Sequence, residues 1–188
     1  QTADGNALPG RDIHLHRIRR AGLLQVVADI AEADLVEAGR QCTGATGCHL
    51  ILSPGASTLD EIDKAISWAS AADHTTVLAC TLAYPTPDED ANLARISTLA
   101  DEYSRVGYSD HTLGTVSAVA AAALGAVLLE KHYTYADSPA GPVADHAMAL
   151  DPVRMAEYVA GANLGARLRG EHRLRPTPAE LPALLNAR

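Results

Sequence analysis

Gly107-Tyr108-Ser109-Asp110-His111-Thr112 and, twenty-one residues after His111, Glu130-Lys131-His132-Tyr133-Thr134 each come at the end of an apolar run. Between these motifs lies a small-residue segment, 115–124, with a glycine on either side. It has about the minimum length of a helix that crosses between two parallel strands. The carboxyl ends of parallel strands face the same side and hold the active site. We therefore expect the imidazoles of His111 and His132 to converge there as a metal-binding pair.

From residue 49 onward, short apolar runs alternate with helical patterns. The alternation predicts strands over 49–53, 75–80, 106–109 and 126–132. It predicts helices over 58–71, with Glu61 placed to complete a capping box, and over 91–103. Another helix is expected from Asp151-Pro152 to about Arg169, because proline is tolerated in a first helical turn. These elements make four βα units in series.

Strands that alternate with helices predict a parallel sheet, either closed as a barrel or open and doubly wound. No glycine-rich dinucleotide or phosphate loop follows a predicted strand, which disfavours the open form. A complete (β/α)8 barrel needs about 250 residues, more than this chain has. The predicted fold class is therefore α/β, a TIM-type (β/α) barrel that is partial or truncated.

The chain divides into three predicted regions. We expect a degenerate N-terminal remnant over 1–48, a barrel portion with four βα units over 49–170, and a linker over 171–188 with a short helix at 179–186. Within the remnant, 23–37 is compatible with a helix and 33–38 with a strand. Because the first residue is Gln1 rather than methionine, the chain is expected to be a portion of something longer.

Composition excludes several classes of function. The chain has 188 residues and 47% hydrophobic content, enough for a buried core. It contains no run of eighteen uncharged apolar residues, and its first twenty residues are polar, so we expect no membrane span or secretory signal and a soluble, cytoplasmic protein. The net charge of −8 argues against nucleic-acid binding, and the short basic run at 14–20 is interpreted as a solvated helix face.

The three cysteines, Cys42, Cys48 and Cys80, match no zinc-binding spacing. Reduced thiols are expected. Cys80 lies in an apolar run, where it is predicted to be a small buried hydrophobic residue rather than a nucleophile.

From about residue 50 to the end, the chain resembles the sialic acid synthase family. The motifs that carry the resemblance are Leu52-Ser53-Pro54-Gly55, Cys80-Thr81, Tyr84-Pro85-Thr86-Pro87, Asn92-Leu93, the two histidine motifs, Leu124-Gly125-Ala126, Gly141-Pro142 with Asp145-His146, and Pro176-Thr177-Pro178. The two histidine motifs at their spacing are the specific signal. Members of this family condense phosphoenolpyruvate with an N-acetylated aminosugar, such as N-acetylmannosamine, to give a nine-carbon keto acid in carbohydrate biosynthesis.

The resemblance implies a (β/α) barrel in which His111 and His132 bind a divalent cation, usually manganese, with magnesium or cobalt as alternatives. The chemistry explains the need for a metal. The methylene carbon of phosphoenolpyruvate is a weak nucleophile, so the sugar aldehyde must be polarised by a Lewis acid. Two neutral imidazoles leave coordination positions for sugar oxygens and water.

The resemblance also implies individual roles. Ser53, Ser109 and Thr81 correspond to substrate-binding residues, the two serines as contacts of phosphoenolpyruvate, and Tyr84 to the wall beside the sugar. Glu130 corresponds to the catalytic carboxylate beside the metal, and Asp145 to the acid that holds the hexosamine. Asp110 is expected to orient His111 or a neighbouring loop. Lys131 is expected to point to the outer face.

Some positions depart from the family pattern. Pro54 removes a backbone donor after the first predicted strand, and Leu82 stands where the family has a polar phosphoenolpyruvate contact. Glu37 and Arg40 stand where the family places a lysine and a serine on the substrate anion, and a glutamate there is repulsive. The phosphoenolpyruvate side of the site is therefore expected to be degraded or missing.

The C-terminal Pro176-Thr177-Pro178 resembles the linker that leads to a small antifreeze-like domain. A partial barrel also exposes strand edges, so we expect a homo-oligomer, with neither nucleic acid nor membrane as a partner. The leading interpretation is a phosphoenolpyruvate-dependent synthase. Two alternatives stay open at this point: a non-catalytic remnant or assembly subunit, and a metal-dependent aldolase or hydrolase.

Overall fold

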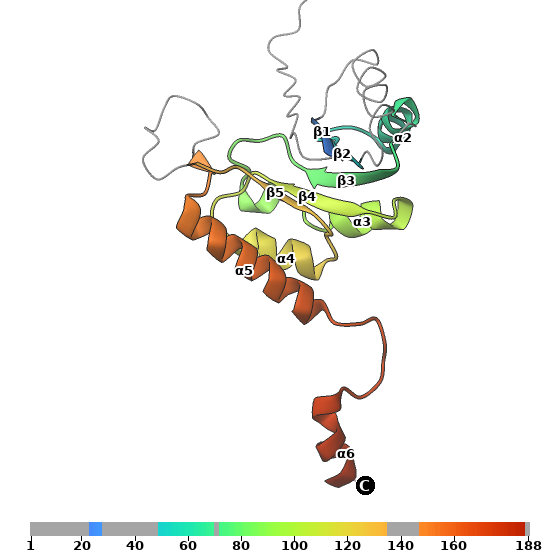
Figure 1. The fold of residues 1–188 in the computed structure, drawn as a ribbon, viewed down its shortest axis with the longest axis vertical. Helices are drawn as coiled ribbons and strands as arrows, with labels where there is room; N and C mark the ends of the chain where they lie inside the picture. The colour runs from blue at the N-terminus through green and yellow to red at the C-terminus, as the bar shows by residue number, and fades with distance from the viewer. Residues whose placement is uncertain (1–22, 28–48, 70–71, 135–146, 187–188) are drawn as a thin grey trace, which may run out of the picture.

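A computed structural model describes residues 23–27, 49–69, 72–134 and 147–186. Within them, parallel strands form one five-stranded sheet: β1 (Leu23–Val27), β2 (His49–Ser53), β3 (His74–Cys80), β4 (Val106–Asp110) and β5 (Leu129–Lys131). Each strand lies beside the one that precedes it in sequence. A doubly wound sheet reverses its order at a switch point, whereas a (β/α) barrel does not. The described sheet is therefore an arc of the barrel type (Figure 1).

Helices follow β2 to β5 in turn: α2 (Leu59–Trp68), α3 (Arg95–Glu102), α4 (Val116–Ala123) and α5 (Pro152–Arg169). Two 3-10 turns, η1 (Asp88–Asp90) and η3 (Pro178–Glu180), and the short α6 (Leu181–Asn186) complete the described elements. Figure 1 shows α6 at the end of an extended segment, away from the sheet. The four predicted βα units are confirmed.

The helix boundaries follow from local chemistry. Thr58 caps α2 and forms the expected capping box with Glu61, and Asp151 caps α5 ahead of Pro152. In contrast, α3 begins at Arg95 rather than at residue 91. The turn η1 precedes it, and Asn92 has a positive φ of 44°, so the backbone cannot continue as one helix.

The helix considered over 23–37 is wrong at its start. Residues 23–27 form β1, not the start of a helix, and β1 pairs in parallel with β2 over its full length. Ladder hydrogen bonds to a neighbouring strand outweigh local helical preference in such a short apolar run. The sheet thus has one strand more than the sequence predicts. The predicted strand at 33–38 lies outside the described residues.

The core lies between the sheet and its helices. Alternate residues of β2, β3 and β4 point to this helix face, and they pack on apolar residues of α2, α3 and α4: Leu50, Leu52, Val77, Ala79, Val106 and Tyr108 against Ile62, Ile96, Leu99 and Ala121. The other strand residues point to the opposite face, which we call the inner face. Strand alternation therefore decides which side chains can reach a barrel-type active site.

The helices α4 and α5 approach each other closely below β4 and β5 (Figure 1). A Cβ atom on Gly165 would lie 2.2 Å from the carbonyl oxygen of Val119. Only glycine fits this contact. Across the described segments, no helix combines the length and apolar character needed to cross a bilayer.

Candidate active site at the carboxyl ends of β4 and β5

The histidine motifs lie in register at the ends of β4 and β5. Ser109 pairs with Glu130, and Asp110 pairs with Lys131. Because side chains alternate along a strand, Ser109 and Glu130 point to the inner face, as do the histidines that directly follow each strand. Asp110 and Lys131 point to the helix face. One pair of strand ends therefore presents two chemically different sets of side chains.

The structure brings together the two histidines that the sequence predicts to converge. The ring centroids of His111 and His132 are 5.5 Å apart, with an angle of 56° between the ring planes. Tyr84, from the loop after β3, lies 4.2 Å from the His111 ring and 6.3 Å from the His132 ring, centroid to centroid. Tyr84 is 39% exposed, so it forms an accessible aromatic surface beside the imidazoles.

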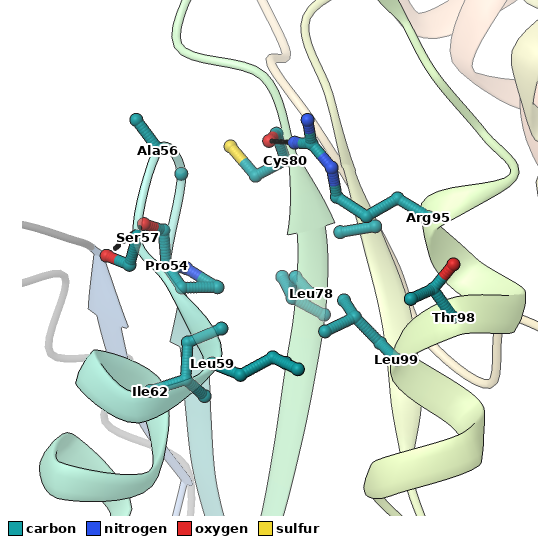
Figure 2. Close-up of a pocket in the computed structure, with 12 residues that line it drawn as sticks. Pro54, Ala56, Ser57, Leu59, Ile62, Leu78, Cys80, Arg95, Thr98 and Leu99 are labelled. Atoms are coloured by element: carbon teal, nitrogen blue, oxygen red, sulfur yellow. Dashed lines mark hydrogen bonds between the residues drawn. The ribbon is translucent and has the colours of Figure 1, made fainter.

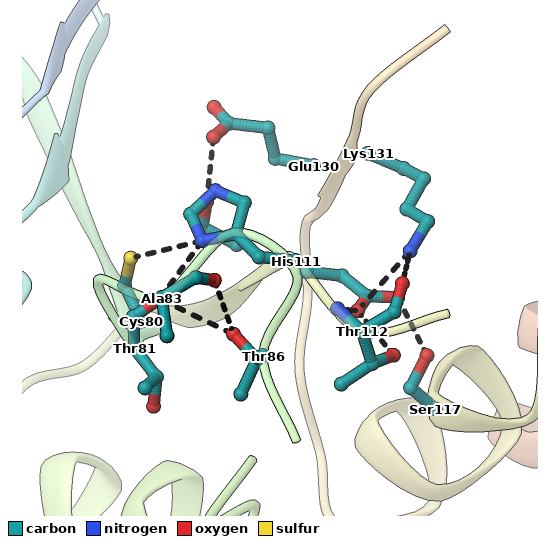
Figure 3. Close-up of polar contacts among 11 residues, drawn as sticks. Cys80, Thr81, Ala83, Thr86, His111, Thr112, Ser117, Glu130 and Lys131 are labelled. Atoms are coloured by element: carbon teal, nitrogen blue, oxygen red, sulfur yellow. Dashed lines mark hydrogen bonds and ion pairs between the residues drawn. The ribbon is translucent and has the colours of Figure 1, made fainter. Parts of the chain in front are cut away.

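A backbone carbonyl fixes the orientation of the His111 ring. Nδ1 of His111 lies 2.9 Å from the carbonyl oxygen of Thr81 (Figure 3). A carbonyl can only accept, so Nδ1 carries the proton and Nε2 carries the lone pair. Metal-binding histidines are commonly oriented in this way by a carbonyl on the second nitrogen. The Thr81 hydroxyl donates instead to the carbonyl of Asp90, at 2.9 Å.

Ser109 positions the candidate catalytic carboxylate. Its hydroxyl donates to Oε1 of Glu130 at 2.6 Å, and Oγ lies 3.5 Å from Nε2 of His111. The single hydroxyl proton is engaged by the carboxylate, which is the stronger acceptor. Ser109 therefore holds Glu130 beside the lone pair of His111.

The loop after β3 folds back onto the end of β4. Thr86 donates its backbone N–H to the carbonyl of His111 at 2.8 Å, and its hydroxyl donates to the carbonyl of Ala83 at 2.8 Å. Thr86 also forms an isolated parallel bridge with Thr112. These contacts place Tyr84 over the histidines and fix the backbone of His111 from a second side.

Asp110 holds the turn that follows His111 rather than the imidazole itself. Its Oδ1 accepts from the backbone N–H of Thr112 at 2.9 Å and from the Thr112 hydroxyl at 2.7 Å, and its Oδ2 accepts from Ser117 of α4 at 2.5 Å. Of the two roles expected for Asp110, the structure supports the one directed at a neighbouring loop.

Lys131 leaves the inner face as predicted, but it does not reach solvent. Its side chain is 1% exposed, and its Nζ lies 3.4 Å from Oδ1 of Asp110. It also donates to the carbonyl of Thr112. Burial lowers the pKa of Lys131, while the Asp110 carboxylate opposes that change. Sequence reasoning missed this buried pair. The available signal was strand alternation, which puts both residues on the helix face.

Ser53 ends β2 on the inner face with a buried, unsatisfied hydroxyl. It is 1% exposed, and its Oγ has no hydrogen-bond partner among the described residues. Nearby, Leu82 covers the turn after β2, since a Cβ on Gly55 would lie 2.6 Å from its Cδ1. A buried hydroxyl without a partner is costly unless a ligand supplies one. The anion contact at Ser53 stays a prediction, and Leu82 is an apolar neighbour of this turn.

A separate cavity of about 250 Å³ opens between α2, α3 and β3 (Figure 2). Among the described residues that line it, Arg95 is the one with a charged side chain, and its guanidinium donates to the carbonyl of Cys80 at 2.6 Å. Burial raises the pKa of the Cys80 thiol to about 11, so the thiol stays protonated at neutral pH. As predicted, Cys80 is a buried residue.

The donor set is suited to a divalent cation with open coordination positions. Nε2 of His111 and the neighbouring His132 ring supply imidazole nitrogen donors. Among the described residues, no group of three or more His, Cys, Asp or Glu side chains is arranged to enclose a metal. Asp145, Glu37 and Arg40 lie outside the described residues.

Comparison with known proteins agrees with this geometry. Residues 27–173 match the NeuB family, which covers more than half of the chain. The chain belongs to the NeuB family. This confirms the resemblance to sialic acid synthases.

Curated relatives of this NeuB-family chain include N,N'-diacetyllegionaminic acid, N-acetylneuraminate-9-phosphate and pseudaminic acid synthases. It is 38% identical over 140 residues to the N,N'-diacetyllegionaminic acid synthase of Legionella pneumophila, covering 71% of this chain and 39% of that protein. It is 34% identical over 146 residues to the mouse N-acetylneuraminate-9-phosphate synthase, covering 74% and 39%. The NeuB-family chain therefore spans about two fifths of the length of these relatives.

A solved relative supports the fold. The N-acetylneuraminic acid (sialic acid) synthetase of Leptospira borgpetersenii, solved with citrate, superimposes with a TM-score of 0.76 at 30% identity. The match covers 87% of this chain and 56% of that one. The NeuB-family chain is thus part of a (β/α) barrel, as the sequence predicts.

Proposed function

We propose that this chain carries the sugar-activating half of a synthase that condenses phosphoenolpyruvate with an N-acetylated aminosugar aldehyde. One observation carries the proposal: the His111 and His132 rings lie 5.5 Å apart on the inner face, beside Glu130 and Tyr84. Family membership supports the reaction class, and the identity of the aminosugar is left to experiment.

His111 and His132 would hold a divalent cation, with manganese proposed ahead of magnesium and cobalt. When bound, the cation acts as a Lewis acid on the aldehyde oxygen. The chain's own residues supply the remaining functions. Tyr84 packs against the sugar, and Glu130, held by Ser109, accepts a hydrogen bond from a sugar hydroxyl or from the water that attacks the adduct.

Ser53 is the proposed contact of the phosphoenolpyruvate anion on this part of the barrel. Its buried hydroxyl can donate to a phosphate or carboxylate oxygen, and this would satisfy the one polar group that β2 leaves unpaired. Leu82 adds no polar contact there. Further cationic contacts for a trianionic substrate are therefore expected from other parts of the barrel.

The test measures phosphate release from phosphoenolpyruvate with manganese and a panel of N-acetylated aminosugars. His111→Ala and His132→Ala are expected to lose activity by about a hundredfold or more, because a Lewis acid contributes several kcal/mol to the barrier. His74→Ala is the matched control, since His74 is an exposed histidine at the opposite end of the sheet.

Other results would contradict the proposal or favour one of the alternative functions. Folded protein that releases no phosphate with any sugar would contradict the catalytic proposal and favour an assembly subunit. Aldehyde-dependent turnover without phosphoenolpyruvate would favour a metal-dependent aldolase. Equal activity in wild type and His111→Ala would contradict the metal role.

A further inference from the structure

A buried polar network lies directly behind the two histidines, on the helix face of the sheet. Asp110 is 0% exposed and the Lys131 side chain is 1% exposed. Their side chains meet between β4 and β5, and Ser117 of α4 joins them through Oδ2 of Asp110 (Figure 3). The ring of Tyr158, in α5, lies 5.9 Å from Nζ of Lys131. The network therefore connects two strands and two helices.

The network is hydrogen-bonded to the residues on both sides of His111. Asp110 precedes it, and Thr112 follows it with its N–H and hydroxyl both bonded to Oδ1 of Asp110. Lys131 then binds the carbonyl of Thr112 from the next strand. Since His132 directly follows Lys131, this link joins the chain positions next to both imidazoles.

Further contacts hold each histidine from the sides away from this link. His111 is held by Thr81 and Thr86, which come from the β3 side. The carbonyl of His132 accepts from the backbone N–H of Leu150 at 2.9 Å, on the α5 side. On the helix face, Lys131 ties the ends of β4 and β5 through Asp110 and Thr112. On the inner face, the hydrogen bond from Ser109 to Glu130 joins the same two strands at 2.6 Å.

We propose that Asp110 and Lys131 are a positioning pair that sets the separation of the His111 and His132 rings for one divalent cation. The inference rests on the proposed function, because it concerns the same metal site. Neither residue touches the cation. The pair acts through the backbone: it fixes the two strand ends relative to each other, and the imidazoles project from those ends to the inner face.

A purely stabilising role accounts less well for the choice of residues. Burying two charges costs desolvation energy, and well-packed apolar residues of similar volume often stabilise a fold as much or more. An apolar pair would not fix the distance or orientation between the two strand ends, because apolar contacts are not directional. Lys131 specifies one distance to Asp110 and one to the Thr112 carbonyl, which is the property that a two-ligand metal site needs.

The test compares metal binding with stability in three variants. Lys131→Met keeps the length of the side chain but removes its charge and its donors. Asp110→Asn with Lys131→Met removes both charges, so that no unpaired carboxylate stays buried and the fold is retained. Thr76→Val is the matched control, because Thr76 is a fully buried hydroxyl that bonds to His49 and Arg105 at the opposite end of the sheet.

Two probes are used: manganese titration by calorimetry, and the visible absorption spectrum of the cobalt(II)-loaded protein, which reports coordination geometry. We expect both Lys131 variants to weaken manganese binding about 10- to 100-fold, as for other residues that orient metal ligands. Their cobalt spectra should differ from the wild-type spectrum. Thr76→Val should lower the melting temperature and leave the affinity and the spectrum unchanged.

The outcomes separate this inference from the proposed function. If wild type binds manganese, His111→Ala does not, and the folded double variant binds with wild-type affinity and spectrum, the positioning inference is overturned and the metal site stands. If wild type and His111→Ala bind manganese equally, the result contradicts the metal site and, with it, the positioning inference.

Discussion

The carbonyl oxygen of Thr81 lies 2.9 Å from Nδ1 of His111. A residue directly after β3 thus fixes a ring that projects from the end of β4, and it does so with its backbone. The hydroxyl of Thr81 is engaged elsewhere. Residue identity at position 81 therefore matters less for the imidazole than the path of the chain there.

The first prediction concerns the tautomer of His111. In the metal-free protein, at a pH well above the ordinary histidine range, we expect Nδ1 to carry the proton because Thr81 can only accept. A long-range ¹H–¹⁵N correlation spectrum distinguishes the two tautomers directly. Protonation at Nε2 would mean that the carbonyl does not orient the ring.

A second prediction concerns Ser109. Ser109→Ala removes a hydrogen bond to a carboxylate, worth about 1.5–3 kcal/mol. If Glu130 acts on substrate, phosphate release should fall by about tenfold or more. Ser67→Ala is the control, since its hydroxyl only donates to a carbonyl of its own helix. Unchanged activity in Ser109→Ala would argue against Glu130 as a catalytic group.

The contact between α4 and α5 gives a third prediction. Gly165→Ala places a Cβ 2.2 Å from the Val119 carbonyl oxygen, which is backbone and cannot move away, so we expect a loss of about 1–3 kcal/mol in the free energy of unfolding. Gly161→Ala, one turn earlier, meets only a Val119 methyl group at 3.1 Å. There the better helix propensity of alanine offsets the contact. Urea unfolding measures the free energy of unfolding of both variants. Equal losses would contradict the close approach of Gly165 to the Val119 carbonyl.

The fourth prediction uses His49 at the start of β2. Burial, with Arg105 and His74 as further causes, lowers the pKa of His49. The unfolded chain then binds the proton more readily than the folded one, so the free energy of unfolding falls as the pH drops through and below about 6.5. His49→Gln should flatten this dependence in urea unfolding between pH 7.5 and pH 5. An unchanged slope would show that His49 does not contribute to it.

Strand periodicity explains how far the fold could be predicted. The apolar runs that end in Ser53, Cys80 and Asp110 were long enough to identify β2, β3 and β4 within a residue. Residues 23–27 form a strand because β2 pairs with them, and such long-range pairing leaves little trace in a five-residue apolar run. The helix cannot include Asn92 because its backbone has a positive φ. An asparagine tolerates this conformation, but its presence in the sequence does not predict it.

The site also has some features that the sequence predicts and others that it does not. The convergence of His111 and His132 follows from parallel strands, so the sequence predicts it. The Thr81 carbonyl could not be identified, because a backbone acceptor carries no residue signature. Lys131 and Asp110 could be placed on the helix face by alternation, but their mutual burial depends on how α4 and α5 cover the strand ends.

The order β1 to β5 also bears on how such a site is inherited. Both candidate metal ligands come from one contiguous unit, β4-α4-β5, and so do Ser109, Glu130 and the buried pair behind them. An exchange of this unit between barrels would transfer the imidazoles together with the residues that space them. The residues proposed to activate the sugar aldehyde are thereby encoded in one piece of sequence, separate from β2, which carries the proposed anion contact Ser53.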